Sequence, residues 1–562
     1  MNNKAIAKTI KLYAQLMELH GDNPFRTKAM GSAAYKLDKL PFVITPQSVT
    51  ELGEIQGIGK GTAQKVESLL STGTFPELEQ LLGTTPEGIL EMLTIKGLGP
   101  KKIQVIWKTL GIETTGELYY ACNENRLVEA KGFGLKTQEE IKRAIEFTIA
   151  NHGWFLYANV EKIAEDAMAV LQDVLPGGRR ISYAGDFRRK CEVLQAVDLV
   201  IEATHDELVE ALTKVGNLSI ETMDNRDLVE ARHESGLPFR MVPVDPQSFF
   251  RQLIISTGSA EHLEQLDELL TEDQLPEFDS EEAIYASLGL QYIEPELREG
   301  TNEIVLAKSG ELPALITYSD LRGALHNHST YSDGVNTLEE MALYCRDELR
   351  LEYLGICDHS RSAVYANGLS IERVQEQWAE IDALNGKMAP FRIFKGIESD
   401  ILADGSLDYP AEVLARFDFV VASIHSNFKM DEEKATTRLL RAIENPYTTI
   451  LGHPTGRLLL SRAGYPVDYR RIIDACAANG VVIEINANPL RLDMDWRWHR
   501  YAMEKGVLLS INPDAHRNSG LHDMRYGVLA ARKGGLTIGA CLNTFSVGQI
   551  AEYFEGRKKR HV

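Results

Sequence analysis

The chain has 562 residues and a mass of 62.7 kDa, with 44% of its residues hydrophobic and 25% charged. At roughly 150 residues per domain, this length predicts three or four domains. The composition excludes a wholly disordered chain, a collagen-like repeat and a coiled-coil rod. The net charge of −21 excludes a protein coated in basic surface.

The negative charge is unevenly distributed along the chain. Residues 1–150 contain 18 Lys and Arg against 17 Asp and Glu, a net charge of +1, whereas the remainder carries −22. A polyanionic partner such as nucleic acid is therefore expected at the N-terminal end. The six cysteines form no CxxC pair, the first residues lack the apolar core of a signal peptide, and no run of about 18 apolar residues occurs. These features predict a cytoplasmic protein with no disulfide framework and no membrane contact.

Residues 4–20 place apolar side chains at helical spacing, and Asn23-Pro24 ends that helix. From there to about residue 150, the pattern predicts short helices separated by glycine turns. Gly-x-Gly occurs at residues 57–59, 97–99 and 132–134, each time before a Lys-containing amphipathic stretch. Further along, strands are predicted at 180–184 and 196–201, a helix-rich region at 259–297 and a linker at about 298–320.

Beyond residue 320, apolar runs of strand length alternate with helix-length segments. The runs span residues 323–328, 353–359, 391–398, 417–425, 448–453, 481–487 and 507–516. This alternation predicts parallel strands joined by right-handed crossovers. Six of the seven runs end in His, Asp or Glu, and in barrels of parallel strands the loops after the strand ends build the active site.

The segment 325–334, with the sequence LHNHSTYSDG, carries the clearest chemical signal. His326 and His328 share one face of an extended strand, because side chains alternate with period two. Two such imidazoles suit one transition-metal ion, and Asp333 adds an oxygen ligand. The other strand ends carry Asp358-His359, Glu398, His425, His453 and Asp514-Ala515-His516. Together these residues favour a metal centre over a set of isolated buried histidines.

The motifs HxH…SDG, DH, GIE, SIHS, GHP and DAH resemble those of the PHP (polymerase and histidinol phosphatase) superfamily over about residues 319–562. The resemblance implies a distorted (β/α)7 barrel that binds up to three divalent ions, Mn²⁺ or Zn²⁺ first and Fe²⁺ as an alternative. A metal-bound water, held by the same ligands, would hydrolyse a phosphoester. One departure is Ala324, where many members carry Asp.

The resemblance to the PHP superfamily also implies a set of nine metal ligands. By position, His326, His328, Glu398 and Asp514 would hold one ion. Glu398 would bridge to a second ion, held also by His425 and His453. Asp333, His359 and His516 would hold the third.

The three glycine turns resemble helix-hairpin-helix motifs. Such a turn brings backbone N–H groups close to a phosphate, and the N-terminus of the following helix favours the anion. These contacts recognise the backbone of DNA and not its sequence. The candidate DNA-binding residues are Gly57, Gly59, Lys60, Gly97, Gly99, Lys101, Lys102, Gly132, Gly134 and Lys136.

Residues 1–298 resemble family X DNA polymerases, through the NPFR sequence at 23–26, the three hairpins, the GDFRR sequence at 185–189 and the tail at 292–299. A family X core followed by a PHP domain is the architecture of bacterial PolX repair enzymes, which the whole chain resembles. The core would comprise helical domains followed by a nucleotidyltransferase-like α+β palm.

The polymerase site departs from the family pattern at the residues that bind metal. The family places three aspartates there, and the matching positions in this chain are Ala196, Asp198 and Pro238. Asp186 stands where the family has a serine that helps to hold the triphosphate. Asp198 would therefore be the remnant of a polymerase site that has lost its activity. Lys65 aligns with the lysine that family X lyase domains use to attack an abasic sugar.

The resemblances imply a DNA-repair 3′-5′ exonuclease that acts on gapped or primer-template DNA without sequence preference. Two alternatives stay open, namely a working gap-filling polymerase with a PHP exonuclease and a small-molecule PHP phosphoesterase. The predicted domains are 1–78 (helix-hairpin-helix), 79–150 (fingers-like, with two further hairpins), 151–230 (palm-like), 231–298 (thumb-like), 299–318 (linker) and 319–562 (PHP).

Overall fold

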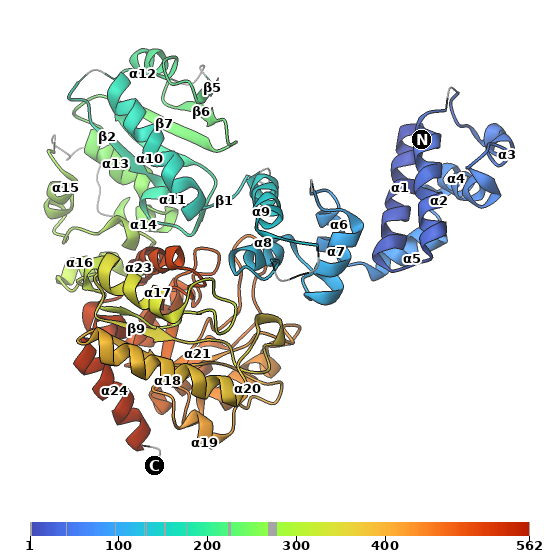
Figure 1. The fold of residues 1–562 in the computed structure, drawn as a ribbon. Coiled ribbons are helices and arrows are strands. Elements are labelled where there is room, and N and C mark those ends of the chain that lie inside the picture. The colour runs from blue at the N-terminus through green and yellow to red at the C-terminus, as the bar shows by residue number, and fades with distance from the viewer. Residues whose placement is uncertain are drawn as a thin grey trace. The chain divides into compact units, whose positions relative to one another are not determined.

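The computed structural model describes residues 3–40, 42–95, 97–128, 130, 132–150, 153–175, 177–222, 226–267 and 278–560. The chain forms two compact units, Met1–Glu146 and Phe147–Val562 (Figure 1). No described helix combines the length and the hydropathy needed to cross a membrane.

The first unit is helical. Its helices are α1 (Asn3–Leu19), α2 (Pro24–Asp38), α3 (Val49–Leu52), α4 (Gly59–Thr72), α5 (Pro76–Thr84), α6 (Glu87–Met92), α7 (Pro100–Gln104), α8 (Thr115–Asn123) and α9 (Leu135–Ala150), the last of which continues into the second unit. α1 confirms the helix predicted over residues 4–20, and it buries Ile6, Ile10 and Leu16. The Asn23 side chain accepts a hydrogen bond from the Phe25 backbone N–H and caps α2, so this motif also begins a helix.

Each Gly-x-Gly pattern lies in a turn that precedes a helix. Gly57, Gly97 and Gly132 have φ angles of +92°, +93° and +92°, a backbone conformation that glycine adopts without strain. α4, α7 and α9 begin within three residues of these glycines. The predicted order of glycine turns and short helices is therefore confirmed.

The first part of the second unit contains α10 (Tyr157–Val174) and a mixed sheet of strand order β2-β4-β7-β6-β5. The strands are β2 (Ile181–Ala184), β4 (Val197–Glu202), β5 (Leu218–Thr222), β6 (Val229–His233) and β7 (Pro238–Val244). β4 and β7 are parallel, and the other neighbours are antiparallel. β2 and β4 confirm the two predicted strands. A smaller antiparallel pair joins β1 (Phe155–Leu156) to β3 (Val193–Leu194).

Helices follow this sheet, namely α13 (Phe249–Thr257), α14 (Ala260–Asp267), α15 (Glu281–Ser287) and α16 (Glu303–Ser309). α14 and α15 agree with the helix-rich region predicted over 259–297, of which residues 268–277 lie outside the described residues. α16, however, lies inside the segment 299–318 that we expected to be a linker. Ile304 and Ala307 of α16 are buried against Leu290 and Ile293, so this segment is folded against its neighbours.

The remainder of the second unit contains only parallel strand pairs among its described strands. These strands are β8 (Gly323–Ala324), β9 (Tyr353–Ile356), β10 (Arg392–Lys395), β11 (Glu398–Asp400), β12 (Val421–Ser423), β13 (Ile450–Leu451), β14 (Val482–Asn486) and β15 (Leu509–Asn512). Each of the seven predicted runs contains a strand, so the predicted parallel arrangement is confirmed.

The strands form one sheet of order β10-β9-β8 and another of order β11-β12-β13-β14-β15. Isolated parallel bridges connect the two, between His359 and Glu398 on one side and between Asn327 and Ala515 on the other. The connecting helices are α17 (Leu338–Leu343), α18 (Ile371–Met388), α19 (Ala411–Leu414), α20 (Glu432–Ile443), α21 (Tyr469–Asn479), α22 (His499–Glu504) and α23 (Met524–Lys533), and α24 (Val547–Arg560) follows.

Candidate metal centre

Eight of the nine predicted ligands follow the carboxyl ends of the parallel strands β8, β9, β12, β13 and β15. The ninth, Glu398, is the first residue of β11 and lies three residues after the end of β10. Because neighbouring parallel strands end at the same edge, side chains from distant parts of the sequence meet there. All nine are described, and none is more than slightly exposed.

Glu398 lies at the centre of this group. Its carboxylate oxygens lie 2.9 Å from His359 Nδ1, 3.0 Å from His453 Nε2, 3.1 Å from His425 Nε2 and 3.3 Å from His326 Nε2. A carboxylate that faces several imidazoles is a suitable bridge between cations. This geometry is compatible with the bridging role predicted for Glu398.

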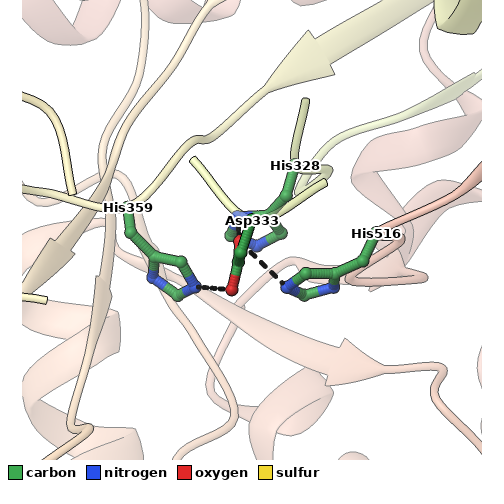
Figure 2. A group of neighbouring side chains, drawn as sticks. All are labelled: His328, Asp333, His359 and His516. Carbon is green, nitrogen blue, oxygen red and sulfur yellow. Dashed lines mark ion pairs between the residues drawn. The ribbon is translucent and has the colours of Figure 1, made fainter. Parts of the chain in front are cut away.

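Asp333 forms a second centre, with His328, His359 and His516 around it (Figure 2). Its oxygens lie 3.4 Å from His516 Nε2, 3.6 Å from His359 Nε2 and 3.9 Å from His328 Nδ1. The His328 and His516 rings are stacked with their centroids 4.2 Å apart. Asp333 comes from the turn after β8, His359 follows β9, and His516 follows β15.

A third group comprises His326, His328 and Asp514. Asp514 Oδ1 lies 3.0 Å from His328 Nε2 and 3.6 Å from His326 Nε2. Most residues in these three groups are ones that were predicted to share an ion. Two residues lie in more than one group, because His328 also lies beside Asp333 and His359 also lies beside Glu398. The assignment of single ligands to single ions therefore stays a prediction.

The donor atoms of this site fit a bound cation. Among the buried polar atoms that form no hydrogen bond are Nε2 of His326, Nδ1 of His328, Oδ2 of Asp333 and Oε2 of Glu398. Buried polar atoms normally have partners, because an unpaired one costs free energy. Imidazole nitrogens and carboxylate oxygens suit Mn²⁺, Zn²⁺ or Fe²⁺.

Two further carboxylates, which sequence reasoning missed, hold the ligand rings. Glu484 Oε1 lies 2.7 Å from His326 Nδ1, and Asp400 Oδ1 lies 2.6 Å from His425 Nδ1. Such partners fix which ring nitrogen faces a metal. Two features of the sequence could have indicated these carboxylates. They are a single Glu inside the apolar run VVIEIN at 481–486 and an Asp two residues after Glu398.

Asp358 organises the turn that carries Asp333. Its carboxylate accepts hydrogen bonds from the backbone N–H groups of Ser329 and Ser332, at 2.8 and 3.1 Å. It also accepts one from Gln377 Nε2 at 2.6 Å. Asp358, part of the DH motif in the sequence, therefore positions the turn and is not itself among the candidate ligands.

The charges of the site set the protonation of its residues. Burial lowers the pKa of His328, to about 4, with a further contribution from His516 and His359. Burial opposes the charged form of His425, but Glu398 and Asp400 outweigh it and raise its pKa to about 10. Burial also disfavours ionised Glu398, yet the surrounding histidines, His425 first, hold its pKa well below its usual range. Glu398 is therefore ionised and His328 neutral, as cation binding requires, whereas His425 must lose a proton when it binds a cation.

Three candidate ligands have strained backbones. His326, His453 and Asp514 have φ angles of +101°, +21° and +52°, a region that residues other than glycine rarely adopt. Strain of this kind persists where the surrounding structure enforces it, and it clusters at functional sites.

The polymerase-like region is the part of the second unit that resembles the palm of a family X polymerase, and its candidate site lies at strands β4 and β7. Asp198 on β4 lies opposite Arg240 on the parallel strand β7, and its oxygens lie 2.7 and 3.0 Å from the Arg240 guanidinium. Ala196 lies directly before β4 and Pro238 is the first residue of β7, each two residues before Asp198 and Arg240, and alternation of side chains would put them on the same side as that pair. That surface therefore carries Ala196, Asp198, Pro238 and Arg240 in place of a carboxylate cluster.

Other acidic groups near this strand are also paired. Glu202, further along the same face of β4, lies 2.6 Å from Arg180 Nε. Asp186, at the position expected to hold a triphosphate, lies 2.5 Å from Arg189 Nη2. Both side chains therefore have arginine partners.

In the first unit, Lys60, Lys101 and Lys136 are exposed next to the glycine turns. Lys102 donates to the Gly97 carbonyl at 3.3 Å. Lys65, the predicted lyase nucleophile, forms an ion pair with Glu77 and lies 5.2 Å from the centre of the Phe75 ring. The role of Lys65 as a lyase nucleophile stays a prediction.

Several known protein families and individual proteins resemble this chain. Residues 1–75 match a helix-hairpin-helix domain, residues 89–146 a SAM-like helix-hairpin-helix tandem, and residues 266–299 a DNA polymerase beta thumb. The DNA polymerase/3′-5′ exonuclease PolX of Bacillus subtilis is 35% identical over 99% of this chain and 100% of its own length. A probable phosphatase of Thermoanaerobacter sp. is 29% identical over 33% of this chain and 76% of its own length. A probable phosphatase of Acetivibrio thermocellus is 30% identical over 30% of this chain and 70% of its own length.

Proposed function

The chain belongs to the PolX family, and we propose that it is a metal-dependent exonuclease that shortens DNA from the 3′ end. The observation that carries this proposal is the convergence of the nine predicted ligands on Glu398 and Asp333. The name of the Bacillus subtilis relative includes a 3′-5′ exonuclease activity, and the site described above would provide the residues for it in this chain.

We infer that strands β8 to β15 close into a distorted (β/α)7 barrel of the PHP type. The two parallel bridges support this, because they connect β9 to β11 and the turn after β8 to the end of β15. β10 and β11 are separated by two residues and would count as one interrupted strand. The barrel would hold up to three ions, with Mn²⁺ or Zn²⁺ favoured by the mixed imidazole and carboxylate donors.

When bound, these ions would supply an activated water and neutralise charge on the phosphodiester. The protein's own contribution is orientation. Glu484 and Asp400 fix the rings of His326 and His425, and Asp358 fixes the turn that carries Asp333. Because these groups are buried and hydrogen bonded, the ligand side chains need little rearrangement to bind a cation.

The first unit would bind the DNA. Its helix-hairpin-helix matches and exposed lysines support contacts to the phosphate backbone, independent of sequence. Gapped or primer-template DNA is the proposed substrate, because the thumb match belongs to a polymerase-like core. That core would serve as a binding platform without polymerase activity, since Asp198 is the only family carboxylate left and it is paired with Arg240.

A second candidate function is hydrolysis of a small phosphate ester. The similarity to probable phosphatases over 193 residues favours it for the metal centre taken alone. The helix-hairpin-helix matches over residues 1–75 and 89–146 favour DNA instead.

The exonuclease proposal is tested with a 5′-labelled primer-template, Mn²⁺ and the purified chain. We expect stepwise shortening of the primer by the wild type. His326→Ala and Asp514→Ala should reduce it more than a hundredfold, because each removes a predicted ligand. DNA binding should stay within about twofold, since these residues are distant in sequence from the hairpins. Exposed His522→Ala is the matched control and should retain full activity.

Shortening at the wild-type rate by either ligand variant would overturn the proposal. A wild-type chain that hydrolyses small phosphomonoesters but leaves the primer intact would favour the phosphatase alternative.

A further inference from the structure

An aromatic side chain lies beside the candidate metal centre. The Tyr365 ring centroid lies 6.1 Å from that of His359 and 6.5 Å from that of His425. Among the described residues, it is the only aromatic side chain other than histidine with a ring contact to a candidate histidine ligand. Tyr365 is 38% exposed, and its neighbour Val364 is 83% exposed. An apolar surface is therefore accessible next to a buried cluster of ligands.

The loop that carries Tyr365 is closed at its base. It begins directly after His359, and Leu369 returns so that its backbone N–H donates to the His359 carbonyl at 2.9 Å. Ser360 and Leu369 form a parallel bridge. Gly368 leaves no room for a side chain, because a Cβ there would lie 2.0 Å from the Ser360 carbonyl oxygen. The loop 360–369 is therefore tied to the strand end that supplies a candidate ligand.

The same loop is tied to a second candidate ligand. Ser362 Oγ donates to Asp400 Oδ2 at 2.6 Å, and the other oxygen of Asp400 lies 2.6 Å from His425 Nδ1. The Ser362 backbone N–H donates to Asp408 Oδ2 at 2.7 Å. Because the loop and the His425 ring share Asp400, the Tyr365 ring has a defined place relative to the ligands.

An accessible ring on a loop that is hydrogen bonded at its base suits a nucleobase. Bases of every sequence have an aromatic face, so stacking on a side chain gives affinity without sequence preference. A small phosphate ester that is bound through its phosphate has no need of such a surface. A DNA end has both a phosphodiester for the buried site and a base beside it.

We propose that Tyr365 stacks on the base of the 3′-terminal nucleotide and thereby positions the last phosphodiester over the metal centre. The proposal rests on the exonuclease function proposed above and names the part of the substrate that the loop 360–369 recognises. Tyr365 is thus a substrate-positioning residue for the 3′ end of DNA.

The experiment compares two oligonucleotides that differ only at the 3′ end, one with a normal nucleotide and one with an abasic residue. With the full-length wild type and Mn²⁺, the normal end should be removed with the lower KM. Tyr365→Ala should raise the KM for the normal end about five- to a hundredfold. It should leave the KM for the abasic end within about twofold, because no base is lost there.

Two further variants separate stacking from structure. Tyr365→Phe keeps the ring and should retain a KM within about threefold of wild type. Tyr318→Ala is the matched control, since Tyr318 is also 38% exposed and makes no ring contact with a candidate ligand. It should leave both KM values unchanged. Mn²⁺ binding, measured by calorimetric titration, should be the same in all variants, which shows that the centre itself is intact.

Equal KM changes for the normal and the abasic end in Tyr365→Ala would overturn the stacking role. So would a Tyr365→Phe variant as defective as Tyr365→Ala. Failure of the wild type to shorten either oligonucleotide would instead refute the exonuclease function on which the proposal rests.

Discussion

Glu484 is a buried carboxylate that contacts several parts of the candidate metal centre without being a predicted ligand. Its Oε1 lies 2.7 Å from His326 Nδ1 and accepts a hydrogen bond from Asn512 Nδ2 at 3.0 Å. Its Oε2 accepts from the His453 backbone N–H at 2.7 Å. Because Glu484 engages Nδ1, the Nε2 atom of His326 faces Glu398 and Asp514. Glu484 therefore orients two candidate ligands at once.

Replacing Glu484 by Gln should weaken metal binding while keeping the fold. Gln occupies the same volume but lacks the charge that holds the His326 ring, and such replacements typically cost ten- to a hundredfold in metal affinity. Calorimetric titration of the metal-depleted chain with Mn²⁺ measures the change. Glu412→Gln, an exposed position in α19, is the control and should bind as the wild type does. An unchanged Mn²⁺ affinity in a folded Glu484→Gln variant would refute the orienting role.

At the scale of elements, the strand pair β4–β7 decides whether the polymerase-like region still works. Family X polymerases need three carboxylates here for two metal ions. This chain offers Asp198 alone, and Arg240 already neutralises it. Loss of several kcal/mol of transition-state stabilisation corresponds to at least about a thousandfold in rate.

We therefore expect no template-directed extension. The measurement is a 5′-labelled primer-template with all four dNTPs and Mg²⁺ or Mn²⁺. It should be made in the His326→Ala background, so that degradation by the metal centre does not mask a product. Asp198→Ala in that background should behave identically, since its carboxylate is no longer used. A primer lengthened by the correct nucleotide would show that the remaining groups suffice.

How far the sequence predicts these elements depends on where a residue lies in its strand. The ligands that follow strand ends were predictable, because parallel strands bring their ends together and the motifs sit at each end. Glu484 lies inside an apolar run, and only the fold shows that its side chain meets His326. The helix α16 was missed because Gly300 and Gly310 read as linker signals, whereas Gly310 in fact ends the helix in a left-handed conformation.

At the scale of the whole second unit, four ion pairs connect the polymerase-like region with the region that carries the metal centre. In these pairs the acidic residues come from 161–299 and the basic residues from 497–533. The pairs are Glu161–Arg525, Glu192–Arg497, Glu296–Arg532 and Glu299–Lys533. Complementary charges of this kind fix how two surfaces align and disfavour other arrangements. Some of the excess acidic residues of this chain thus form ion pairs inside the second unit.

The pair Glu299–Lys533 should contribute most to this interface, because it is the least exposed. The Lys533 side chain is 1% exposed and that of Glu299 is 14% exposed. Lys533→Met should lower the free energy of unfolding of the second unit by about 3 kcal/mol, since it leaves a buried carboxylate without its lysine. The value lies at the low end of the range for buried pairs because Arg189 Nε still lies 3.0 Å from Glu299.

Denaturation of the full chain, followed by circular dichroism, measures this effect. The double variant Lys533→Met with Glu299→Gln should be more stable than Lys533→Met alone, because the carboxylate that has lost its lysine is then removed as well. Lys558→Met is the control, since Lys558 is 37% exposed at 3.4 Å from Asp418 and such surface pairs contribute at most about 1 kcal/mol. If Lys533→Met unfolds at the same denaturant concentration as Lys558→Met, the charge pairs do not hold the two regions together, and apolar contacts alone must do so.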